Sequence, residues 1–322
     1  MPHLPRRALL AAAGAGLFAP AIARAQGARS IRFVVPFAAG GLTDLVTRMV
    51  AQHMAQSLGQ TIIVENRPGG NAIIAAEAVA HAPKDGMTVL VGGTAGLPLN
   101  VLMRPNLPYR LEDFSSVALL FDGPLTLTTH AGLPPTDIAS FVDYARAQPH
   151  PLRYATNGTG SVGHLFGILL AEAMGIRLTD VAYRGNGPST TDLLAGLIEI
   201  SVEAPTTTLE HVRAGRLRLL GLSASERAPL LPEVPTFREA GYPQLVTSFW
   251  TGLLVPAGTP AGMIARLNAA ASAAMRSEPI RQRLTSEALR PLHGAPLLLD
   301  EQMQRDREQW GRIITERRIT LE

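Results

Sequence analysis

The sequence predicts an α/β protein with two similar lobes and a ligand cleft between them. Short apolar runs rich in β-branched residues alternate with longer stretches of helical period, which is typical of helices layered on a largely parallel sheet. This alternation occurs twice without a long linker, so we expect discontinuous lobes. The chain has 322 residues, of which 46% are hydrophobic, and this is enough for two cores of ordinary domain size.

The first 25 residues are expected to be a cleaved export signal. Arg6 and Arg7 form a basic start, an apolar run follows, and residues 23–25 are Ala-Arg-Ala, with small side chains where a signal peptidase reads. We therefore expect cleavage after Ala25 and a periplasmic protein. The apolar run is shorter than the roughly 20 residues of a spanning helix. The arginine pair leaves the twin-arginine route open beside the general one.

Removing this segment changes the charge of the protein. The whole chain has 29 Lys and Arg against 26 Asp and Glu. Because three arginines lie in the first 25 residues, the rest carries 26 charges of each sign, and its charge does not indicate nucleic acid or an anionic membrane as a partner. The lack of cysteine excludes disulfides and thiolate chemistry.

The first lobe is expected to begin with a β-α-β-α-β pattern. Its strands are predicted at 31–36, 61–65 and 88–92, and its helices at 45–58 and 73–81. Apolar residues recur near the helical period in the first helix, which ends at Gly59.

The second lobe repeats this pattern. Strands are predicted at 125–129, 152–155, 179–183, 198–202 and 217–223, with helices at 138–147, 165–174 and 189–197. A strand at 250–255 and helices at 260–275, 279–286 and 300–316 complete the chain. We expect the chain to cross over near Thr126 and to return near Leu222, so that lobe 1 comprises 26–125 and 224–322 and lobe 2 comprises 126–223. Small ligands usually bind in such interdomain clefts.

The first of three candidate loops runs from Pro36 to Asp44, between a strand and a helix. Gly40 and Gly41 permit backbone conformations that other residues avoid. The free N–H groups at the following helix start suit an anion. We expect Thr43 or Asp44 to cap this helix. A simple turn with a capping acid remains the alternative.

The second loop, at 154–164, contains a glycine pattern. Gly158, Gly160 and Gly163 satisfy G-x-G-x-x-G, and Asp180 follows at a distance compatible with a ribose-binding acid. A dinucleotide site is therefore an alternative. Two arguments oppose it: Asp180 does not lie at the far end of its strand, and export removes the protein from the soluble nicotinamide pool.

The same loop does not have the spacing of a hydrolytic site. Ser161 lacks the glycine two residues before it that a nucleophile elbow requires. A helix-capping hydroxyl is its commoner role. We expect His164 to pack or to form a hydrogen bond, because the sequence places no acid to orient it as a general base.

The third loop, at 183–189, again joins a strand to a helix. Arg184 is suited to pair with a carboxylate through two hydrogen bonds, and a solvated arginine is the alternative. The eight histidines are scattered, and no carboxylate cluster resembles a calcium loop. We expect neither a metal ion nor a cofactor.

Short motifs follow one another along the chain in a specific order. Among them are Val35-Pro36-Phe37, Val64-Glu65-Asn66-Arg67-Pro68-Gly69, Pro83-Lys84-Asp85-Gly86, Tyr183-Arg184-Gly185, Pro232-Glu233-Val234-Pro235-Thr236 and Val255-Pro256-Ala257-Gly258-Thr259-Pro260. In this order they resemble the substrate-binding proteins of the tripartite tricarboxylate transporter system, the Bug family. The resemblance covers essentially the whole chain after the export signal.

The resemblance implies a type II periplasmic binding protein fold, with two α/β lobes, a central ligand cleft and two crossover strands. It implies a monomer that captures a small carboxylate-bearing solute for a secondary transporter with one large and one small membrane subunit. A periplasmic sensor that reports the ligand to a membrane kinase is an alternative. An exported enzyme that uses the loop at 158–163 is another.

The resemblance also implies ligand contacts in both lobes, made largely by loop backbone amides and ordered water. In the first lobe they fall on Phe37, Ala38, Ala39, Gly40, Gly41, Thr94 and Ala95. In the second lobe they fall on Asn157, Gly158, Thr159, Gly160, Ser161, His164, Tyr183, Arg184 and Gly185.

The chain departs from the family pattern where Glu203-Ala204 replaces the usual Asp-Asn. The first loop also has Ala38-Ala39 where prolines are common. We expect Glu203 to face the cleft and to disfavour a second ligand carboxylate nearby, because like charges repel. The ligand of a relative is therefore not transferred to this chain.

Overall fold

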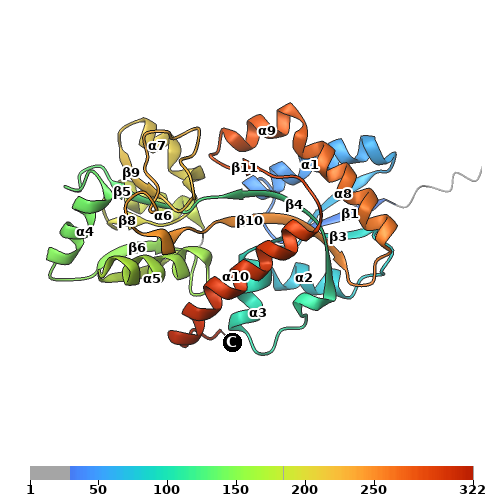
Figure 1. Cartoon of the computed structure of the whole chain (residues 1–322), viewed down its shortest axis with the longest axis horizontal. Helices are drawn as coiled ribbons and strands as arrows, with labels where there is room; N and C mark the ends of the chain where they lie inside the picture. The colour runs from blue at the N-terminus through green and yellow to red at the C-terminus, as the bar shows by residue number, and fades with distance from the viewer. Residues whose placement is uncertain (1–29, 184, 322) are drawn as a thin grey trace, which may run out of the picture.

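The computed structural model describes residues 30–183 and 185–321, which form two α/β lobes arranged along the long axis of the molecule (Figure 1). The expected export signal at 1–25, its cleavage site after Ala25 and the candidate residue Arg184 lie outside the described residues. Within the described ranges, no helix combines the length and the apolar character needed to cross a membrane.

The first lobe is built on a six-stranded sheet. Its strands are β1 (Ile31–Val35), β2 (Ile62–Asn66), β3 (Thr88–Gly93), β4 (Phe114–Gly123), β10 (Phe249–Pro256) and β11 (Arg290–Pro291). They lie in the order β11-β4-β10-β3-β1-β2. β1 pairs in parallel with β2 and β3, whereas β10 runs antiparallel to β3 and β4.

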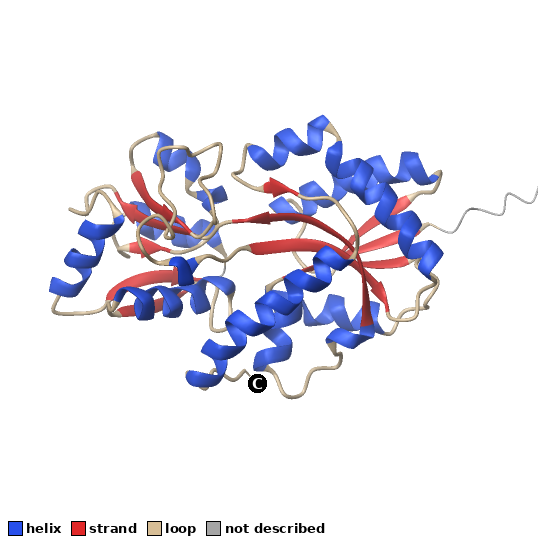
Figure 2. Ribbon diagram, in the orientation of Figure 1, coloured by secondary structure: helices blue, strands red, loops and turns tan. Residues whose placement is uncertain are grey.

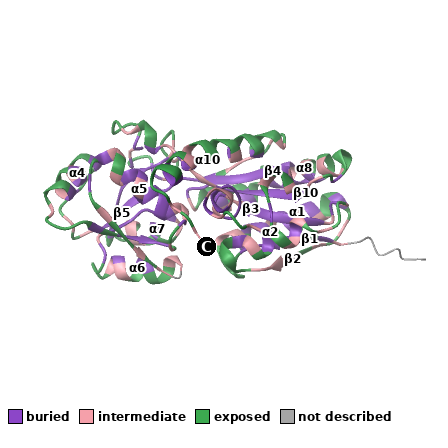
Figure 3. Cartoon of the chain, turned by 90° about the horizontal axis from the view of Figure 1, so that it is seen from below, coloured by how far each residue is buried: buried purple, intermediate pink, exposed green. Residues whose placement is uncertain are grey.

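Helices cover both faces of this sheet. They are α1 (Leu42–Leu58), α2 (Ile73–Ala80), α3 (Asn100–Met103), α8 (Ala261–Arg276) and α9 (Glu278–Thr285), with a π-helical turn η2 (Ala95–Leu99). Phe33 and Val35 pack with α1, α8 and α9, while Val34 packs on the opposite face with α2. β1 is therefore apolar on both faces, as a strand covered on both sides must be. Figure 3 shows the buried strands enclosed by helices with exposed outer surfaces.

The second lobe contains a five-stranded sheet. Its strands are β5 (Thr126–His130), β6 (Leu152–Thr156), β7 (Leu178–Ala182), β8 (Ile200–Ser201) and β9 (Leu217–Leu222), in the order β7-β6-β8-β5-β9. Its helices are α4 (Ile138–Ala147), α5 (Val162–Met174), α6 (Asn186–Leu194) and α7 (Leu209–Arg213). α4 and α5 contribute to one core, and α6 and α7 contribute to cores that contain Leu193 and Leu209.

Without β11, the order β2-β1-β3-β10-β4 of the first sheet corresponds to the order β7-β6-β8-β5-β9 of the second, and each sheet includes an antiparallel strand that enters from the other lobe. β5 follows β4 after Pro124 and Leu125, and β10 follows the loop segment after β9. Figure 2 shows the long strands β4 and β10 running between the lobes. The predicted fold class, two α/β lobes joined by two crossover strands, is therefore confirmed.

The last helix, α10 (Leu297–Glu316), contacts both lobes and lies obliquely across the molecule (Figure 1). Leu299, near its start, packs in a core of the first lobe. Trp310 and Ile313, near its end, pack in the core that contains α5. Arg312 adds an ion pair to Glu172 of α5 at 3.4 Å.

Several elements differ from the sequence-based predictions. β4 is not among the predicted strands, because Ser115, Ser116 and Asp122 interrupt its apolar sequence. In the structure, Ser116 Oγ donates to Asp300 Oδ1 at 2.6 Å, so its polar group is satisfied.

Both helices beside the second-lobe loops begin earlier than predicted. α5 starts three residues sooner, after the N-cap residue Ser161. α6 also starts three residues sooner, after Gly185, because Pro188 is tolerated in the first turn of a helix. The strand predicted at 198–202 is limited to Ile200–Ser201.

Candidate functional site

A cleft of about 480 Å³ is lined by residues from both lobes. Residues of the first lobe that line it are Pro36, Phe37, Thr43, Asn71, Ala72, Ala76, Leu90, Val91, Gly92, Gly93, Thr94, Ala95, Gly96, Leu97, Phe249, Trp250 and Thr251. Residues from the crossover and the second lobe are Leu125, Asn157, Ser161, Val162, Gly185, Asn186, Glu203 and Ala204. Many of them follow the carboxyl ends of parallel strands, where ligands bind in open α/β sheets.

The loop after β1 is held in shape by Asp44. Its Oδ2 accepts from Gly40 N–H at 2.9 Å and from Arg48 Nε at 3.0 Å. Its Oδ1 accepts from Asn66 Nδ2 at 2.8 Å, and the same amide group donates to Phe37 O at 3.0 Å. Burial opposes ionisation, but the hydrogen bonds from Arg48, Gly40 and Asn66 outweigh it and lower the pKa of Asp44.

This geometry corrects the predicted cap of α1. The N-cap residue is Gly41, which makes no side-chain cap hydrogen bond, and Asp44 instead binds the amide of the preceding glycine. Thr43 lines the cleft rather than capping the helix. The Gly40 amide is therefore not free for an anion, because its hydrogen bond is already made within the loop.

The loop after β6 is held in an equivalent way by His164. Gly160 N–H donates to His164 Nδ1 at 3.2 Å. Ser161 Oγ accepts from His164 N–H at 3.2 Å, so the predicted capping role of Ser161 is confirmed. Burial lowers the pKa of His164, which favours the neutral ring that this hydrogen bond requires.

Each glycine of the G-x-G-x-x-G pattern has a local structural role. Gly158 and Gly160 have φ angles of 96° and 79°, in the left-handed region that favours glycine. A Cβ atom on Gly163 would overlap the carboxyl group of Glu203. Asp180 is exposed in the middle of the edge strand β7. Loop geometry and packing therefore account for the pattern without a dinucleotide.

Glu203 is the one ionisable side chain among the described residues that line the cleft. Its backbone carbonyl accepts from the N–H and Oγ1 of Thr126, at 3.0 and 2.8 Å. Its Oε1 is buried and has no hydrogen-bond partner within the described chain. Burial raises the pKa of Glu203 to about 7, although the backbone N–H of Asn157 lowers it.

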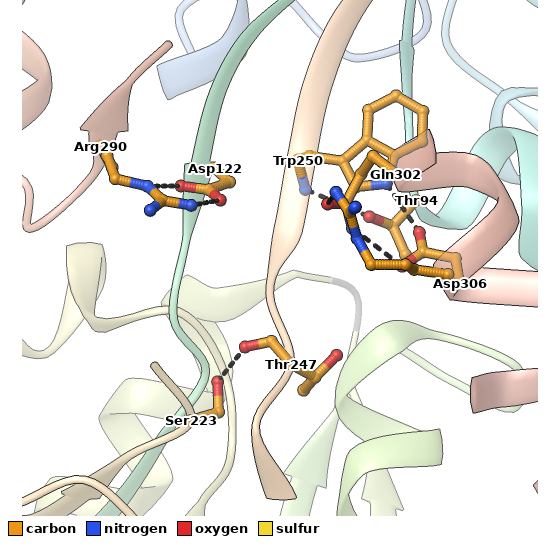
Figure 4. Close-up of polar contacts among 9 residues, drawn as sticks. Thr94, Asp122, Ser223, Thr247, Trp250, Arg290, Gln302 and Asp306 are labelled. Atoms are coloured by element: carbon orange, nitrogen blue, oxygen red, sulfur yellow. Dashed lines mark hydrogen bonds and ion pairs between the residues drawn. The ribbon is translucent and has the colours of Figure 1, made fainter. Parts of the chain in front are cut away.

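Trp250 forms a wall of the cleft and is fixed from two sides (Figure 4). Its backbone N–H donates to Thr94 Oγ1 at 3.1 Å, and its indole Nε1 donates to Asp306 Oδ2 of α10 at 2.6 Å. Asp306 Oδ1 accepts from Gln302 Nε2 at 3.1 Å. Burial raises the pKa of Asp306 to about 7.

Ser223 joins the two crossover segments. Its Oγ accepts from Leu125 N–H at 2.8 Å and donates to Thr247 O at 2.6 Å, the latter bond visible in Figure 4. The side chain is fully buried. The backbone of Ser223 binds the same two segments: its N–H donates to Leu125 O and its carbonyl accepts from Thr247 N–H, both at 2.9 Å. The hydroxyl group thus adds two hydrogen bonds to this junction.

The structure brings seven of the predicted contact residues to the cleft. They are Phe37, Thr94, Ala95, Asn157, Ser161, Gly185 and Glu203. The described residues that were predicted but do not line it are Ala38, Ala39, Gly40, Gly41, Gly158, Thr159, Gly160, His164 and Tyr183. Tyr183 donates its hydroxyl to Asp192 Oδ2 at 2.8 Å instead. Within the described ranges, no group of three or more acids or histidines is placed to hold a metal ion.

Sequence reasoning missed several lining residues. Asn71 and Ala72 have φ angles of 51° and 74°, an unusual backbone for residues other than glycine. The only signal for them was the Gly69-Gly70 turn at the end of a strand. Trp250 lies in a predicted strand, but only the crossover topology places the start of that strand at the cleft.

The comparisons with known proteins agree with this architecture. Residues 46–319 match the TctC family, described as the tripartite tricarboxylate transporter family receptor. BugT of Bordetella pertussis is 33% identical over 306 residues, which cover 94% of each chain. The structure of MatC from Rhodopseudomonas palustris with bound malate is similar, at 36% identity and a TM-score of 0.77, over 89% of this chain and 99% of MatC. The R. palustris protein Rpa4515 with adipate is similar at 30% identity and a TM-score of 0.79, over 89% of this chain and 96% of that one.

The chain therefore belongs to the TctC family of tripartite tricarboxylate transporter receptors, which are periplasmic solute-binding proteins and not enzymes.

Proposed function

We propose that this receptor captures a small carboxylate-bearing solute in the cleft between its lobes and delivers it to a transporter with one large and one small membrane subunit. The observation that carries the proposal is the cleft lined by described residues of both lobes. The malate and adipate bound by the two R. palustris proteins support a carboxylate ligand. The receptor acts as a periplasmic monomer after cleavage behind Ala25, with lobes bounded near residues 125 and 223.

The ligand carboxylate binds at the second-lobe loops. Ser161 and Asn186 offer polar groups there, and Gly185 brings backbone to the cleft. Asn157 also lines the cleft, but its backbone N–H already binds Glu203. Arg184, which precedes Gly185 in the sequence, supplies the positive charge. Phe37, Thr94 and Ala95 contact the ligand from the first lobe. The remaining predicted loop residues act indirectly, because their hydrogen bonds and glycine conformations set the shape of the loops.

Calorimetric titration of the processed protein with malate and with adipate tests the proposal. We expect saturable binding of at least one of them, together with a rise in melting temperature that depends on ligand concentration. Ala95→Phe fills part of the cleft and should weaken binding by roughly tenfold or more. Ala139→Phe, at an exposed position of α4, is the matched control and should bind like the wild type. Failure of a broad panel of mono-, di- and tricarboxylates to bind would contradict the proposal.

A further inference from the structure

The charge distribution in the cleft is unusual for a site that receives an anion. The described lining is made of glycine, aliphatic, aromatic and neutral polar residues, with Glu203 as its single ionisable side chain. An ionised carboxylate that is buried among uncharged residues interacts strongly with any charge brought near it. The ligand group that faces Glu203 therefore has a large effect on affinity.

The position of Glu203 is fixed by its surroundings. Its carbonyl oxygen is held by two hydrogen bonds from Thr126, on the crossover strand β5. Its carboxyl group packs directly against Gly163 in the first turn of α5, in space that any larger residue would fill. Because the carboxyl is confined in this way, it cannot turn away from an unfavourable ligand without a structural change.

The hydrogen-bonding capacity of this carboxyl is incomplete within the described protein. Oε1 is buried and unpartnered among the described residues, while the residue as a whole remains partly exposed along the cleft. A buried acceptor without a donor is destabilising, and an ionised one is more so. A ligand that offers a hydrogen-bond donor at this place relieves that penalty, whereas a carboxylate adds repulsion between like charges.

We infer that Glu203 selects a solute with one carboxylate and, at its other end, an ammonium or hydroxyl group, in preference to a dicarboxylate. This inference rests on the proposed function, because it assumes that the first carboxylate binds elsewhere in the cleft. It assigns to Glu203 the role of specificity-determining residue, and to Gly163 that of a positioning residue that leaves room for the carboxyl group.

A ligand series that differs only at one end tests this inference. Butanoate, 4-hydroxybutanoate, 4-aminobutanoate and succinate share the first carboxylate and the chain length, and a six-carbon series that ends with 6-aminohexanoate and adipate repeats the comparison. Titrations at about pH 8.5 keep Glu203 ionised. We expect the wild type to bind the amino or hydroxy acid of one series roughly tenfold or more tightly than the dicarboxylate of equal length. Glu203→Gln should reduce that ratio to within about threefold and should strengthen dicarboxylate binding.

Two further variants separate position from charge. Gly163→Ala is compatible with a helix, but its Cβ displaces the carboxyl end of Glu203, so it should reduce the ligand preference although the charge remains. Glu210→Gln makes the same replacement at an exposed position on α7. This control should leave the preference between amino or hydroxy acids and dicarboxylates unchanged.

The possible failures of the two proposals are distinguishable. An unchanged ligand order in Glu203→Gln, or a wild type that prefers the dicarboxylates, would overturn the inference and leave carboxylate capture intact. No binding of any member by the wild type and by Glu203→Gln would overturn the proposed function, and the inference with it.

Discussion

At the scale of single residues, the loop after β1 and the loop after β6 contain the same type of hydrogen bond. In each loop the third residue of the following helix accepts the N–H of the glycine that precedes the N-cap residue: Asp44 accepts from Gly40, and His164 from Gly160. The acceptor is an ionised acid in one lobe and a neutral imidazole in the other. Because burial lowers the pKa of His164 below its usual 6.5, its contribution to stability is lost as the pH falls below about 6.5.

The acid in the first loop leads to a pH-dependent prediction. Asp44→Ala removes the acceptor for Gly40, Arg48 and Asn66 and should lower the free energy of unfolding by roughly 1–3 kcal/mol at neutral pH. Since the folded pKa of Asp44 lies below its usual 3.8, its contribution is complete above that value and disappears as the pH falls through the folded pKa. Urea unfolding from pH 7 to pH 3 measures the difference. Asp143→Ala, an exposed site on α4, provides the control, and a loss independent of pH would refute the argument.

At the scale of elements, α10 fixes the part of β10 that lines the cleft. The bond from Trp250 Nε1 to Asp306 joins the helix to the crossover strand, and Thr94 holds the same tryptophan from the end of β3. Asp306 is buried, and this burial makes ionisation of its carboxyl group unfavourable although Trp250 and Gln302 both donate hydrogen bonds to it.

Replacing this buried acid should change how stability depends on pH. Asp306 has its usual pKa of 3.8 in the unfolded chain and a pKa of about 7 in the fold. Between these values the unfolded state is ionised while the folded state is protonated, so the contribution of Asp306 falls as the pH rises. Asp306→Asn keeps an acceptor for Trp250 and does not titrate. We therefore expect the free energy of unfolding of the variant minus that of the wild type, measured with urea, to be roughly 1–3 kcal/mol larger at pH 8 than at pH 4. A difference that does not change with pH in Asp306→Asn would exclude the mechanism.

At the scale of the whole molecule, two crossover segments join the lobes and are the places where closure on a ligand would change the backbone. Leu125 and Thr247 lie on these segments, and Ser223 binds both. Lobes that close on a ligand change conformation at a few such residues. Ser223 therefore links the two segments, through its backbone and through its hydroxyl group.

Removal of this hydroxyl should weaken the link without removing packing. Ser223→Ala leaves the Leu125 amide without its acceptor in a buried site, and we expect a loss of about 1–3 kcal/mol in the free energy of unfolding. Hydrogen exchange of the Leu125 amide should accelerate in the same variant. Ser57→Ala, at an exposed position of α1, should change stability by less than about 0.5 kcal/mol. Unaltered exchange at Leu125 would show that Ser223 does not couple the segments.

Much of the fold, but less of the cleft, was predictable from the sequence. Apolar periodicity gave the helix at 138–147 with its observed ends, and capping chemistry gave the role of Ser161. The strand β4 was not predicted, because residues distant in sequence, such as Asp300, form the hydrogen bonds of its polar side chains. Among the cleft residues, Asn71 and Trp250 depend on backbone conformation and on sheet order, which no local pattern encodes.

The position of α10 also affects the order in which the protein is completed. Leu299 packs in a core of the first lobe and Trp310 packs in the core of the second. The 20 residues of α10 therefore contribute to the cores of both lobes. A chain emerging from the ribosome cannot finish either lobe until its final helix is free. The cores of both lobes therefore stay incomplete until α10 has been synthesised, so neither lobe reaches its final packing independently of the other.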